Sequence, residues 1–528
     1  MSALCEQAYI FAPPPSSDEQ PPIPEKVDLS TNEPKDVETC WKSVKLVGIL
    51  SFLGMIESGL IMVGEWPYMS EIDPLATANF FALASSSSKI GKITFSLIFS
   101  FWTYKTKTVR PPLVAGRIIA FLGCILYLCV EFLPSGRRYL MLICYILFAV
   151  AGSSATVLRV YAVAISSRAD RPKAFALIAL ATTSLVAGPA LQLAFSWIKY
   201  PGYTFFSNVH FNLYTAPVWV STFLNIVSIT IILCFLEEKL TTAKRVEDET
   251  SLPFSLTLIK DSIVKLKKED VPWLLVAVCC LEKMVVGLTM STLASVSAPL
   301  NMAVFSWSGE TQVTVTSISM LICGVLSIGT TFVIMGTSIT KKVPTRIIFL
   351  FAVSIMAFMY FGTYPLPGIS SPVPVYNATT GKGCNPATYS WCTTASAPKP
   401  LIFITITLLV LGLSMPIIHI SVDTVYSKIL ANIDQSLMQG FAVILEDLVM
   451  IVGPLYATEM FTLYGQAPLW IANGLITISA ALVWWFAFRL DSSDPEERAF
   501  NRGDTQTGRT GSPRRIGTGE TMESNGRS

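Results

Sequence analysis

Charged side chains stand inside apolar stretches of this chain that are long enough to cross a bilayer. They are Glu57, Lys89, Lys92, Glu282, Lys283, Glu446 and Asp447. Each such charge costs about 2.5–3.5 kcal/mol at the centre of a lone membrane helix, so the set would approach roughly 20 kcal/mol. A folded domain has a net stability of only about 5–15 kcal/mol. We therefore expect these side chains to pair with one another or to line a hydrated cavity through which a solute moves.

The two lysines of the second apolar stretch are candidates for a gate. Lys89 and Lys92 are three residues apart and therefore share one face of a helix. We expect one of them to pair with Glu446 or Asp447 when the cavity is closed on one side, and to separate when it opens. The alternative is a static ion pair that holds the two halves of the protein together.

Two acids are candidates for proton coupling. Glu57 and Glu282 lie at comparable depths in the first and seventh apolar stretches, and a carboxylate that faces a cavity can bind and release a proton during transport. The alternative for each is a structural ion pair. Lys283 could neutralise an acid or contact an anion, although adjacent residues of a helix point about 100° apart.

A histidine and an arginine complete the set of candidate residues. His419 and Asp423 are four residues apart, and a histidine titrates in the range that suits a pH sensor, with a purely structural contact as the alternative. No third ligand lies nearby in sequence, so we expect no metal site. Arg159 lies near the end of its stretch, where we expect it to snorkel or to clamp a loop during conformational change rather than to contact substrate.

One pattern recurs in both halves of the chain. A Val-Tyr pair precedes a polar junction and an apolar run that ends in Gly-Pro, and the distance from Tyr161 to Gly188 and from Tyr426 to Gly453 is 27 residues in both cases. A shared spacing of this length indicates duplication. Proline weakens the backbone ladder of a helix, so we expect the Gly-Pro pairs to permit bending, with close packing as the alternative. These pairs are Gly188 with Pro189 and Gly453 with Pro454.

Composition fixes the class of protein. Of the 528 residues, 52% are hydrophobic and 14% are charged, and the apolar residues fall in long runs. This pattern predicts an all-α, polytopic membrane protein in contact with the lipid bilayer. The net charge of +2 gives no reason to expect a nucleic-acid partner. The chain has no phosphate-binding loop, so we do not expect transport driven directly by ATP hydrolysis. It has no nucleophile–base pattern, so we expect neither an enzyme nor a cofactor.

About twelve segments of roughly 20 residues are long enough to span a membrane. They are 46–65, 79–102, 113–132, 139–163, 174–197, 213–236, 273–296, 313–336, 346–365, 400–422, 436–460 and 466–489. They form two six-helix bundles, within 41–236 and 272–490. The connection 237–271 carries Leu256, Ile259, Ile263 and Leu266 at helical spacing, which predicts an amphipathic helix on the cytosolic surface. Residues 1–40 and 491–528 have the composition of disordered tails.

The distribution of basic residues predicts the orientation. Lysine and arginine lie mostly in alternate connections, and this bias places that side of the membrane, with both termini, in the cytosol. Arg137 and Arg138 fall on the opposite side as an exception. The loop 366–399 then faces the lumen, where the sequon at Asn377 predicts glycosylation. In the same oxidising compartment we expect a disulfide, formed by Cys384 and Cys392.

Short sequences along the chain are similar to a known family. They are Trp66-Pro67-Tyr68 with Ile72-Asp73-Pro74, Asn212-Leu213-Tyr214-Thr215-Ala216-Pro217, Gly383-Cys384 with Trp391-Cys392, Leu411-Gly412 with Pro416, and Tyr426-Ser427-Lys428-Ile429-Leu430. Together with the two six-helix groups, they resemble the major facilitator superfamily. Within it they resemble the lysosomal branch altered in a late-infantile neuronal ceroid lipofuscinosis. The resemblance runs from Trp41 to Arg489 and implies an endolysosomal membrane protein with a transporter fold. The family's cargo is poorly defined, and chloride conductance is one proposal for it.

Two positions depart from the superfamily pattern. Many members carry Gly-x-x-x-Asp-x-x-Gly-Arg-Arg after the second helix, whereas Ser100 to Arg110 reads SFWTYKTKTVR here. In the fourth helix, the arginine of related proteins falls at Tyr145. Gating and proton-coupling roles tied to those residues therefore do not carry over to this chain.

These observations predict a monomeric secondary transporter. We expect it to move a small solute or ion across a lysosomal or late endosomal membrane by alternating access, with protons as the candidate coupling ion. One alternative is an anion channel on the same fold, in which Lys89, Lys92 and Lys283 supply the attractive field. The other is a transporter-like sensor or scaffold in which the charges only lock the two halves together. The sequence leaves the cargo open.

Overall fold

The computed structural model is mostly helical over the residues that it describes. Those residues are 39–106, 108–166, 177, 186–206, 209–236, 272–337, 343–366, 368, 370–377, 382–430 and 435–490. The tail 491–528, nearly all of the tail 1–40 and the amphipathic helix expected within 237–271 lie outside the described residues.

The N-terminal half is a helical bundle with one small hairpin. Its elements are α2 (Trp41–Met62), α3 (Glu65–Ile72), α4 (Ala78–Thr106), α5 (Arg110–Leu128), η2 (Val130–Phe132), α6 (Arg137–Gly152), α7 (Ser154–Ile165), α9 (Ala187–Leu193), β1 (Tyr203–Phe206), β2 (Val209–Phe211) and α10 (Ala216–Phe235). Proline stands in the first turn of α5 and of α10, where its missing N–H would have had no helical partner. The strands β1 and β2 pair antiparallel.

The C-terminal half has a similar construction. Its elements are α13 (Trp273–Val304), α14 (Gly309–Gly336), α16 (Thr345–Gly362), β3 (Ser371–Pro372), η4 (Ser390–Thr393), β4 (Ser396–Ala397), α17 (Pro400–Leu430), α18 (Gln435–Tyr464) and α19 (Gln466–Leu490). Helices suit a bilayer because every backbone polar group inside a helix finds its partner within the same segment. The start of α14 is capped by Ser308, whose side-chain oxygen accepts a hydrogen bond from the backbone N–H of Thr311.

Ten helices in the described part of the chain are long and apolar enough to cross a membrane. They correspond to ten of the twelve predicted segments, since α6 and α7 together form one span. The predicted segment 79–102 is α4, a helix of 29 residues whose apolar run is interrupted by Lys89 and Lys92. Of the predicted segment 174–197, only residue 177 and the part from 186 onward are described.

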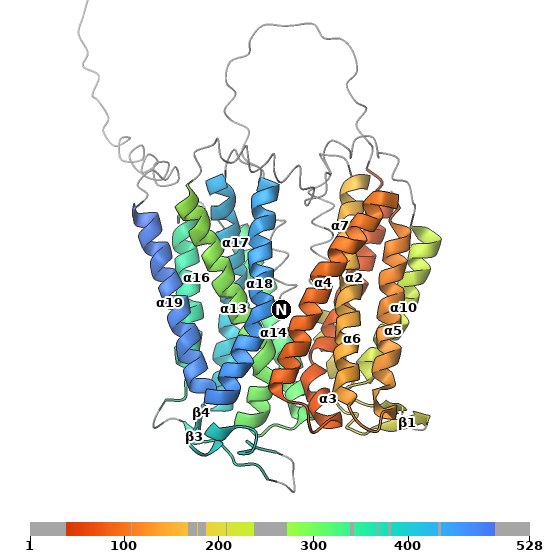
Figure 1. Cartoon of the computed structure of the whole chain (residues 1–528). Helices are drawn as coiled ribbons and strands as arrows, with labels where there is room; N and C mark the ends of the chain where they lie inside the picture. Colours follow the sequence, from red (N-terminus) through yellow and green to blue (C-terminus); the bar gives the residue numbers. More distant parts are fainter. Residues whose placement is uncertain are drawn as a thin grey trace, which may run out of the picture.

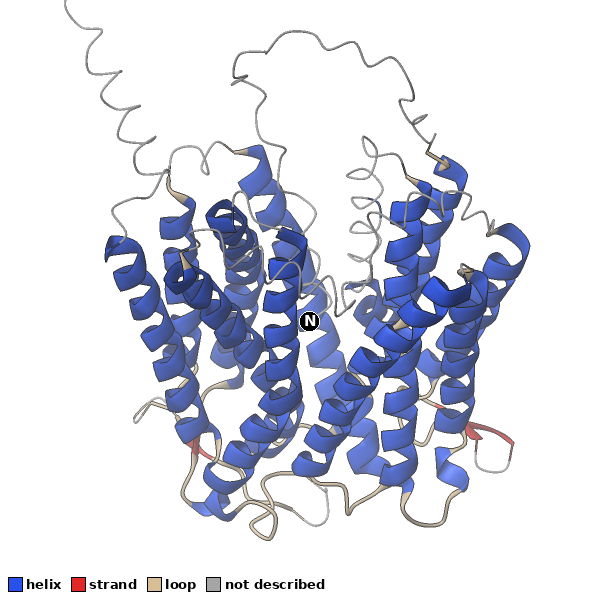
Figure 2. Ribbon diagram, turned by 45° about the horizontal axis from the view of Figure 1, so that its top comes forward, coloured by secondary structure: helices blue, strands red, loops and turns tan. Residues whose placement is uncertain are grey.

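The buried apolar residues divide between the two halves. One core cluster is confined to residues 275–488, and two others are built almost wholly from residues 44–236. In Figure 1 the helices of the two halves stand side by side and approach each other at the end that carries β1, β3, β4 and α3. We call this the strand end. Figure 2 shows the same divergence of the two helix groups away from the strand end.

Contacts between the halves concentrate toward the strand end. Asn79 on α4 donates a hydrogen bond to the carboxylate of Glu459 on α18 at 2.6 Å and accepts one from Thr462 at 3.1 Å. About two turns further along, the hydroxyl of Ser86 donates to the backbone oxygen of Ile451 at 2.7 Å. Helix α3 packs against α13 and α14 in the same region. The described contacts therefore close this end of the interface.

Candidate functional site

A cavity of about 500 Å³ lies between the two halves. The N-terminal half contributes residues of α2 to α7 to its wall, and the C-terminal half contributes residues of α13, α14, α17 and α18. Cavities that hold small ligands commonly measure roughly 300–1,000 Å³. The space is therefore large enough for a small organic molecule.

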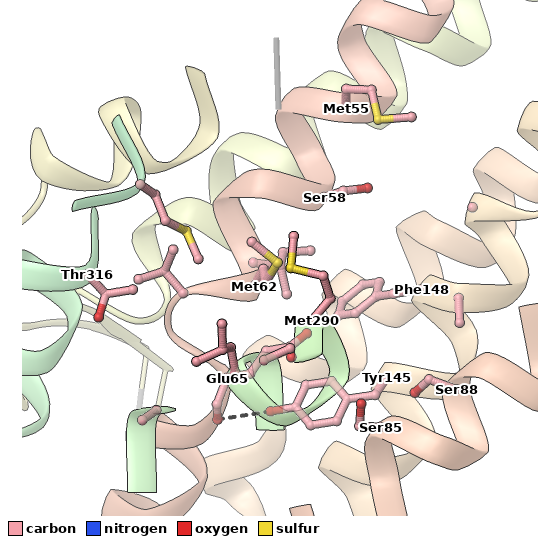
Figure 3. A pocket seen from close by; sticks show the side chains of 18 of the residues that line it. Met55, Ser58, Met62, Glu65, Ser85, Ser88, Tyr145, Phe148, Met290 and Thr316 are labelled. Carbon is pink, nitrogen blue, oxygen red and sulfur yellow. Dashed lines mark hydrogen bonds between the residues drawn. The ribbon is translucent and has the colours of Figure 1, made fainter. Parts of the chain in front are cut away.

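One face of α4 forms a polar stripe along this cavity. Ser85, Ser88, Lys89 and Lys92 recur at steps of three, one and three residues, which places them on the same side of a helix, and all four line the cavity. Figure 3 shows Ser85 and Ser88 beside Tyr145 in the cavity wall. The predicted shared face of the two lysines is thus directed at the candidate site.

The predicted proton-coupling residue Glu57 has two polar partners within its own half. Arg117 on α5 donates to its Oε2 at 2.8 Å, and the side-chain amide of Asn225 on α10 donates to its Oε1 at 2.6 Å. The guanidinium also reaches the backbone oxygen of Leu50 at 3.4 Å. Glu57 and Arg117 both line the cavity. This arrangement is the structural ion pair that the sequence left open as the alternative.

Glu65 and Tyr145 border the strand end of the cavity. The hydroxyl of Tyr145 donates to the backbone oxygen of Glu65 at 3.0 Å, so α6 holds the first turn of α3 (Figure 3). The Glu65 carboxylate interacts electrostatically with Lys89. At the position where related facilitators have an arginine, this chain therefore has a neutral hydrogen-bond donor to the backbone.

Four predicted residues are buried inside the C-terminal half, away from the described cavity wall. The ammonium of Lys283 on α13 lies 2.5 Å from Asp423 on α17 and 5.7 Å from the centre of the Tyr426 ring. The side chain of Glu282 is 0% exposed, and neither of its oxygens has a hydrogen-bond partner among the described residues. His419, one turn from Asp423, is also buried. None of the four belongs to the described cavity wall, and Lys283 pairs across helices rather than with its neighbour Glu282.

The register of α4 against α18 places the remaining charges. The two helices run antiparallel, with Asn79 beside Glu459 and Ser86 beside Ile451. Because both helices rise by the same amount per residue, the same register puts Lys92 at the level of Glu446. Asp447 lies one residue nearer the strand end. The lysines and acids that we expected to form a gate therefore stand at one depth on two helices that pack together.

The glycines of the two Gly-Pro pairs occupy equivalent positions in the halves. Gly188 packs against the backbone of α2 at Gly59, and Gly453 packs against Ser291 on α13. At both sites an added Cβ would collide with the neighbouring helix. These contacts lie within each half, so they favour close packing, the alternative to bending. Of the adjacent prolines, Pro454 lines the cavity and Pro189 is buried in α9.

The two arginines that departed from the charge rule hold α3 at the strand end. Arg137 donates to the backbone oxygen of Ile72 at 3.3 Å, and the backbone N–H of Arg138 donates to the carboxylate of Asp73 at 3.2 Å. The guanidinium of Arg137 and the backbone N–H of Arg138 therefore have a local structural use. Arg159, expected near a loop, lies in the cavity wall instead.

The loop expected in the lumen folds against the strand end. Cys384 and Cys392 form a disulfide, and the indole N–H of Trp391 donates to the backbone oxygen of Phe461 at 2.9 Å, which ties the loop to α18. Asn377 is exposed in the same loop.

Sequence reasoning missed several polar residues of the site. Arg117, Asn225, Glu65 and the cavity-facing hydroxyl groups of α2 carry no motif, and only their contacts with the recognised residues reveal them. No group of three histidine, cysteine or acidic side chains is arranged to hold a metal ion within the described ranges.

Comparisons with known proteins agree with this architecture. The family model described as Major Facilitator Superfamily matches residues 46–399. "Major facilitator superfamily domain-containing protein 8" of Xenopus laevis is 24% identical over 458 residues, which cover 82% of this chain and 88% of that protein.

Solved structures with a similar fold include several transporters. A D-xylose-proton symporter superposes with a TM-score of 0.58 at 12% identity, over 84% of this chain and 97% of that one. The nucleoside transporter NupG gives 0.54 at 11% identity, over 84% and 98%. The xylose transporter XylE from E. coli, in a partially occluded inward open conformation, gives 0.55 at 11% identity, over 84% and 99%. The chain belongs to the Major Facilitator Superfamily.

Proposed function

We propose that this protein is a proton-coupled secondary transporter that carries a small solute across an endolysosomal membrane by alternating access. The observation that carries the proposal is the cavity between the two halves, which contact one another toward the strand end. A cavity at such an interface changes the side to which it opens when the halves rock against each other. A single chain supplies both halves, so the transporting unit is a monomer.

The strand end faces the lumen in this proposal. The basic residues of the connections favour the opposite side as cytosolic. The exposed Asn377 of a glycosylation sequon and the disulfide between Cys384 and Cys392 both suit a lumenal loop. Endoglycosidase treatment of the expressed protein tests this point. A mobility shift that disappears in Asn377→Gln supports it, whereas protection of that loop from an enzyme added on the lumenal side contradicts it.

Glu282 is the residue to which we assign proton coupling. A buried carboxylate without a hydrogen-bond partner is costly to retain unless it has a use. Its neighbour in sequence, Lys283, forms the ion pair that joins α13 to α17, so a proton on Glu282 would change the charge on the same turn of α13. Glu57 is less suited to this role because Arg117 and Asn225 already satisfy its oxygens.

The gate that opens away from the strand end involves the lysines of α4 and the acids of α18. Their common depth supports this assignment, since rocking of the halves moves α4 relative to α18. A charge exchange, Lys92→Glu with Glu446→Lys, tests it. If the exchanged protein folds but transports poorly, the gating role holds. If either single reversal leaves transport unchanged, the gating role fails.

Trans-stimulation tests the transporter itself. Vesicles that contain the purified protein are loaded with an unlabelled solute, and uptake of the labelled solute is followed after a pH step. A carrier exchanges one for the other, so the internal solute accelerates uptake. Uptake that ignores the internal solute and does not saturate contradicts the proposal.

A second candidate function is an anion channel. The observation that favours it is the pair of lysines at the wall of the cavity, Lys89 and Lys92, which would attract an anion. Patch recording from the same vesicles separates the two functions. A chloride current that is lost in the double variant Lys89→Ala with Lys92→Ala favours the channel. Proton-dependent exchange of solute without a current favours the carrier.

A further inference from the structure

Charge is distributed unevenly over the wall of the central cavity. Every charged residue of the described wall belongs to the N-terminal half. These residues are Lys89, Lys92, Arg117, Arg159, Glu57 and Glu65. Four are cationic and two are acidic. The C-terminal half contributes no charged residue to the described wall.

The acids of this wall already face cations. Glu57 forms its ion pair with Arg117, and Glu65 interacts electrostatically with Lys89. Arg159 on α7 makes no hydrogen bond or ion pair with another residue in the part of the chain that is described, although its side chain borders the cavity. An arginine in a membrane interior is costly, and a ligand with a negative charge would compensate that cost. The guanidinium of Arg159 is therefore available to a solute in the cavity.

The donors on this side suit an anionic head group. Ser85 and Ser88 place hydroxyl groups on the same face of α4 as the two lysines. Ammonium, guanidinium and hydroxyl groups donate hydrogen bonds to carboxylate or phosphate oxygens, and bonds with a charged partner are the stronger ones. The guanidinium of Arg159 can bind two such oxygens at once.

The opposite wall suits an apolar body. It presents large apolar and aromatic side chains of the C-terminal half, among them Met290, Leu293, Trp307, Phe403, Leu408 and Leu411. A halide ion would gain nothing from this surface, because it has no apolar area to bury. Burial of an apolar body against these residues is favourable in proportion to the area removed from water.

We infer that the cargo is an amphipathic organic anion, with its carboxylate or phosphate toward α4 and α7 and its apolar body against α13, α14 and α17. This assignment rests on the proposed transporter function, because it identifies the class of solute for the same cavity. A volume of about 500 Å³ accommodates an anion that carries an aromatic ring or a medium-length aliphatic chain.

Thermal unfolding of the full-length protein in lipid nanodiscs tests the substrate class without any need for transport, since a ligand that binds the folded protein raises its melting temperature. The probes are 4-phenylbutyrate, its neutral amide, the amine of matched length, butyrate and chloride. We expect 4-phenylbutyrate to raise the melting temperature at concentrations where the other four do not. Stabilisation by the amide or the amine as strong as that by the acid overturns the inference, as does the absence of any effect of the acid.

Variants locate the two ends of the ligand. Arg159→Gln and Lys92→Gln are expected to weaken binding of 4-phenylbutyrate by about tenfold or more, because each removes a charge-assisted contact. Lys105→Gln, which removes an exposed lysine from the far end of the same helix, is the matched control and leaves binding unchanged. Trp307→Ala is expected to reduce the preference for 4-phenylbutyrate over butyrate. Wild-type affinity in both the Arg159 and the Lys92 variants contradicts the placement of the head group.

Flux measured in parallel separates this inference from the proposed function. If vesicles exchange the amide or the amine but not the acid, transport stands and the substrate class is wrong. If the acid binds in nanodiscs but is never exchanged across the vesicle membrane, the transporter function fails while the binding site stands. Each variant's melting temperature without ligand is compared with that of the wild type. This comparison shows whether a variant that binds the probe weakly is still folded.

Discussion

The carboxylate of Glu57 on α2 lies 2.8 Å from the guanidinium of Arg117 on α5, and both residues belong to the N-terminal half. Asn225 on α10 binds the other carboxylate oxygen, so three helices of one half share a single polar network. In the alternating access that we propose, the halves move as units, so this network should stay intact during transport. Its role is therefore to fix the N-terminal wall of the cavity.

Removal of one member of this network should destabilise the protein strongly. Arg117→Ala leaves the buried Glu57 carboxylate without its counter-charge, and breaking a buried pair in this way costs about 3–5 kcal/mol. The double variant Glu57→Gln with Arg117→Gln should recover much of that loss, because no unpaired charge remains. Melting temperatures of the single and double variants in detergent provide the comparison. Losses that simply add would show that the two side chains are not coupled.

Glu282 should behave in the opposite way. Its carboxylate is buried without a partner, so Glu282→Gln is expected to leave the melting temperature unchanged or to raise it. The same change should remove the dependence of flux on pH. Asp423→Asn is the matched control in the same cluster, and it should lower stability because Lys283 loses its ion pair. A destabilised Glu282→Gln protein with normal pH dependence would falsify the coupling role.

The closed strand end depends on a glycine at the start of α14. A Cβ added at Gly309 would collide with the hydroxyl of Tyr214 and would lie 3.4 Å from the Cβ of Pro67. Gly309→Ala should therefore push the halves apart and shift the population toward a state open at the strand end. Gly329→Ala on the same helix is the control, since an added Cβ there has no neighbour within 4 Å. The accessibility of a cysteine introduced in the cavity to a reagent added on the strand-end side measures the shift. Equal labelling of the two variants contradicts this role of Gly309.

Acid should favour closure of the strand end. Partial burial on α3, together with the nearby carboxylate of Glu310 on α14, raises the pKa of Glu71 above its ordinary value. Tyr214 and Tyr200 also interact electrostatically with Glu71, and Arg137 lies near Tyr200. The raised pKa belongs to the closed state, in which the two acids approach one another, so this state binds the proton more tightly than a state with the halves apart. As pH falls from above the raised pKa toward the ordinary one, closure is favoured, and as pH rises it is disfavoured.

The variant Glu71→Gln isolates this effect. It should close the strand end at neutral pH and should weaken the dependence of closure on pH. Glu310→Gln should act in the same direction, because it removes the repulsion from the other side. The measurement is the labelling rate of the same cavity cysteine at about pH 5 and at about pH 7.5, because the lower pH favours the protonated carboxyl. A wild-type rate that does not change between the two pH values contradicts the argument.

The sequence predicted the helices well because their signal is local. Apolar runs of sufficient length identified the spans. The loop cysteines were recognisable because only eight residues separate them. All of these features can be read from neighbouring positions.

The partners within the site could not be read in this way. Arg117 and Asn225 are separated from Glu57 by 60 and 168 residues, and no motif links them. The neighbour of Lys283 in sequence was Glu282, whereas its partner in space is Asp423, because adjacent helical residues point in different directions. The uneven distribution of charge over the cavity likewise depends on which face each helix turns inward, and packing between the halves decides that.

Reciprocal movement of the two ends is the most direct test of alternating access. Spin labels are attached to cysteines in a background without accessible native cysteines, one pair at the exposed positions Leu75 and Leu401 near the strand end and another at Trp41 and Trp273 at the opposite end. Double electron–electron resonance then gives both distance distributions in nanodiscs as pH is varied. The account predicts that conditions which lengthen the strand-end distance shorten the distance at the opposite end. A single fixed distribution at both ends under all conditions, in protein that still passes solute or current, would contradict it.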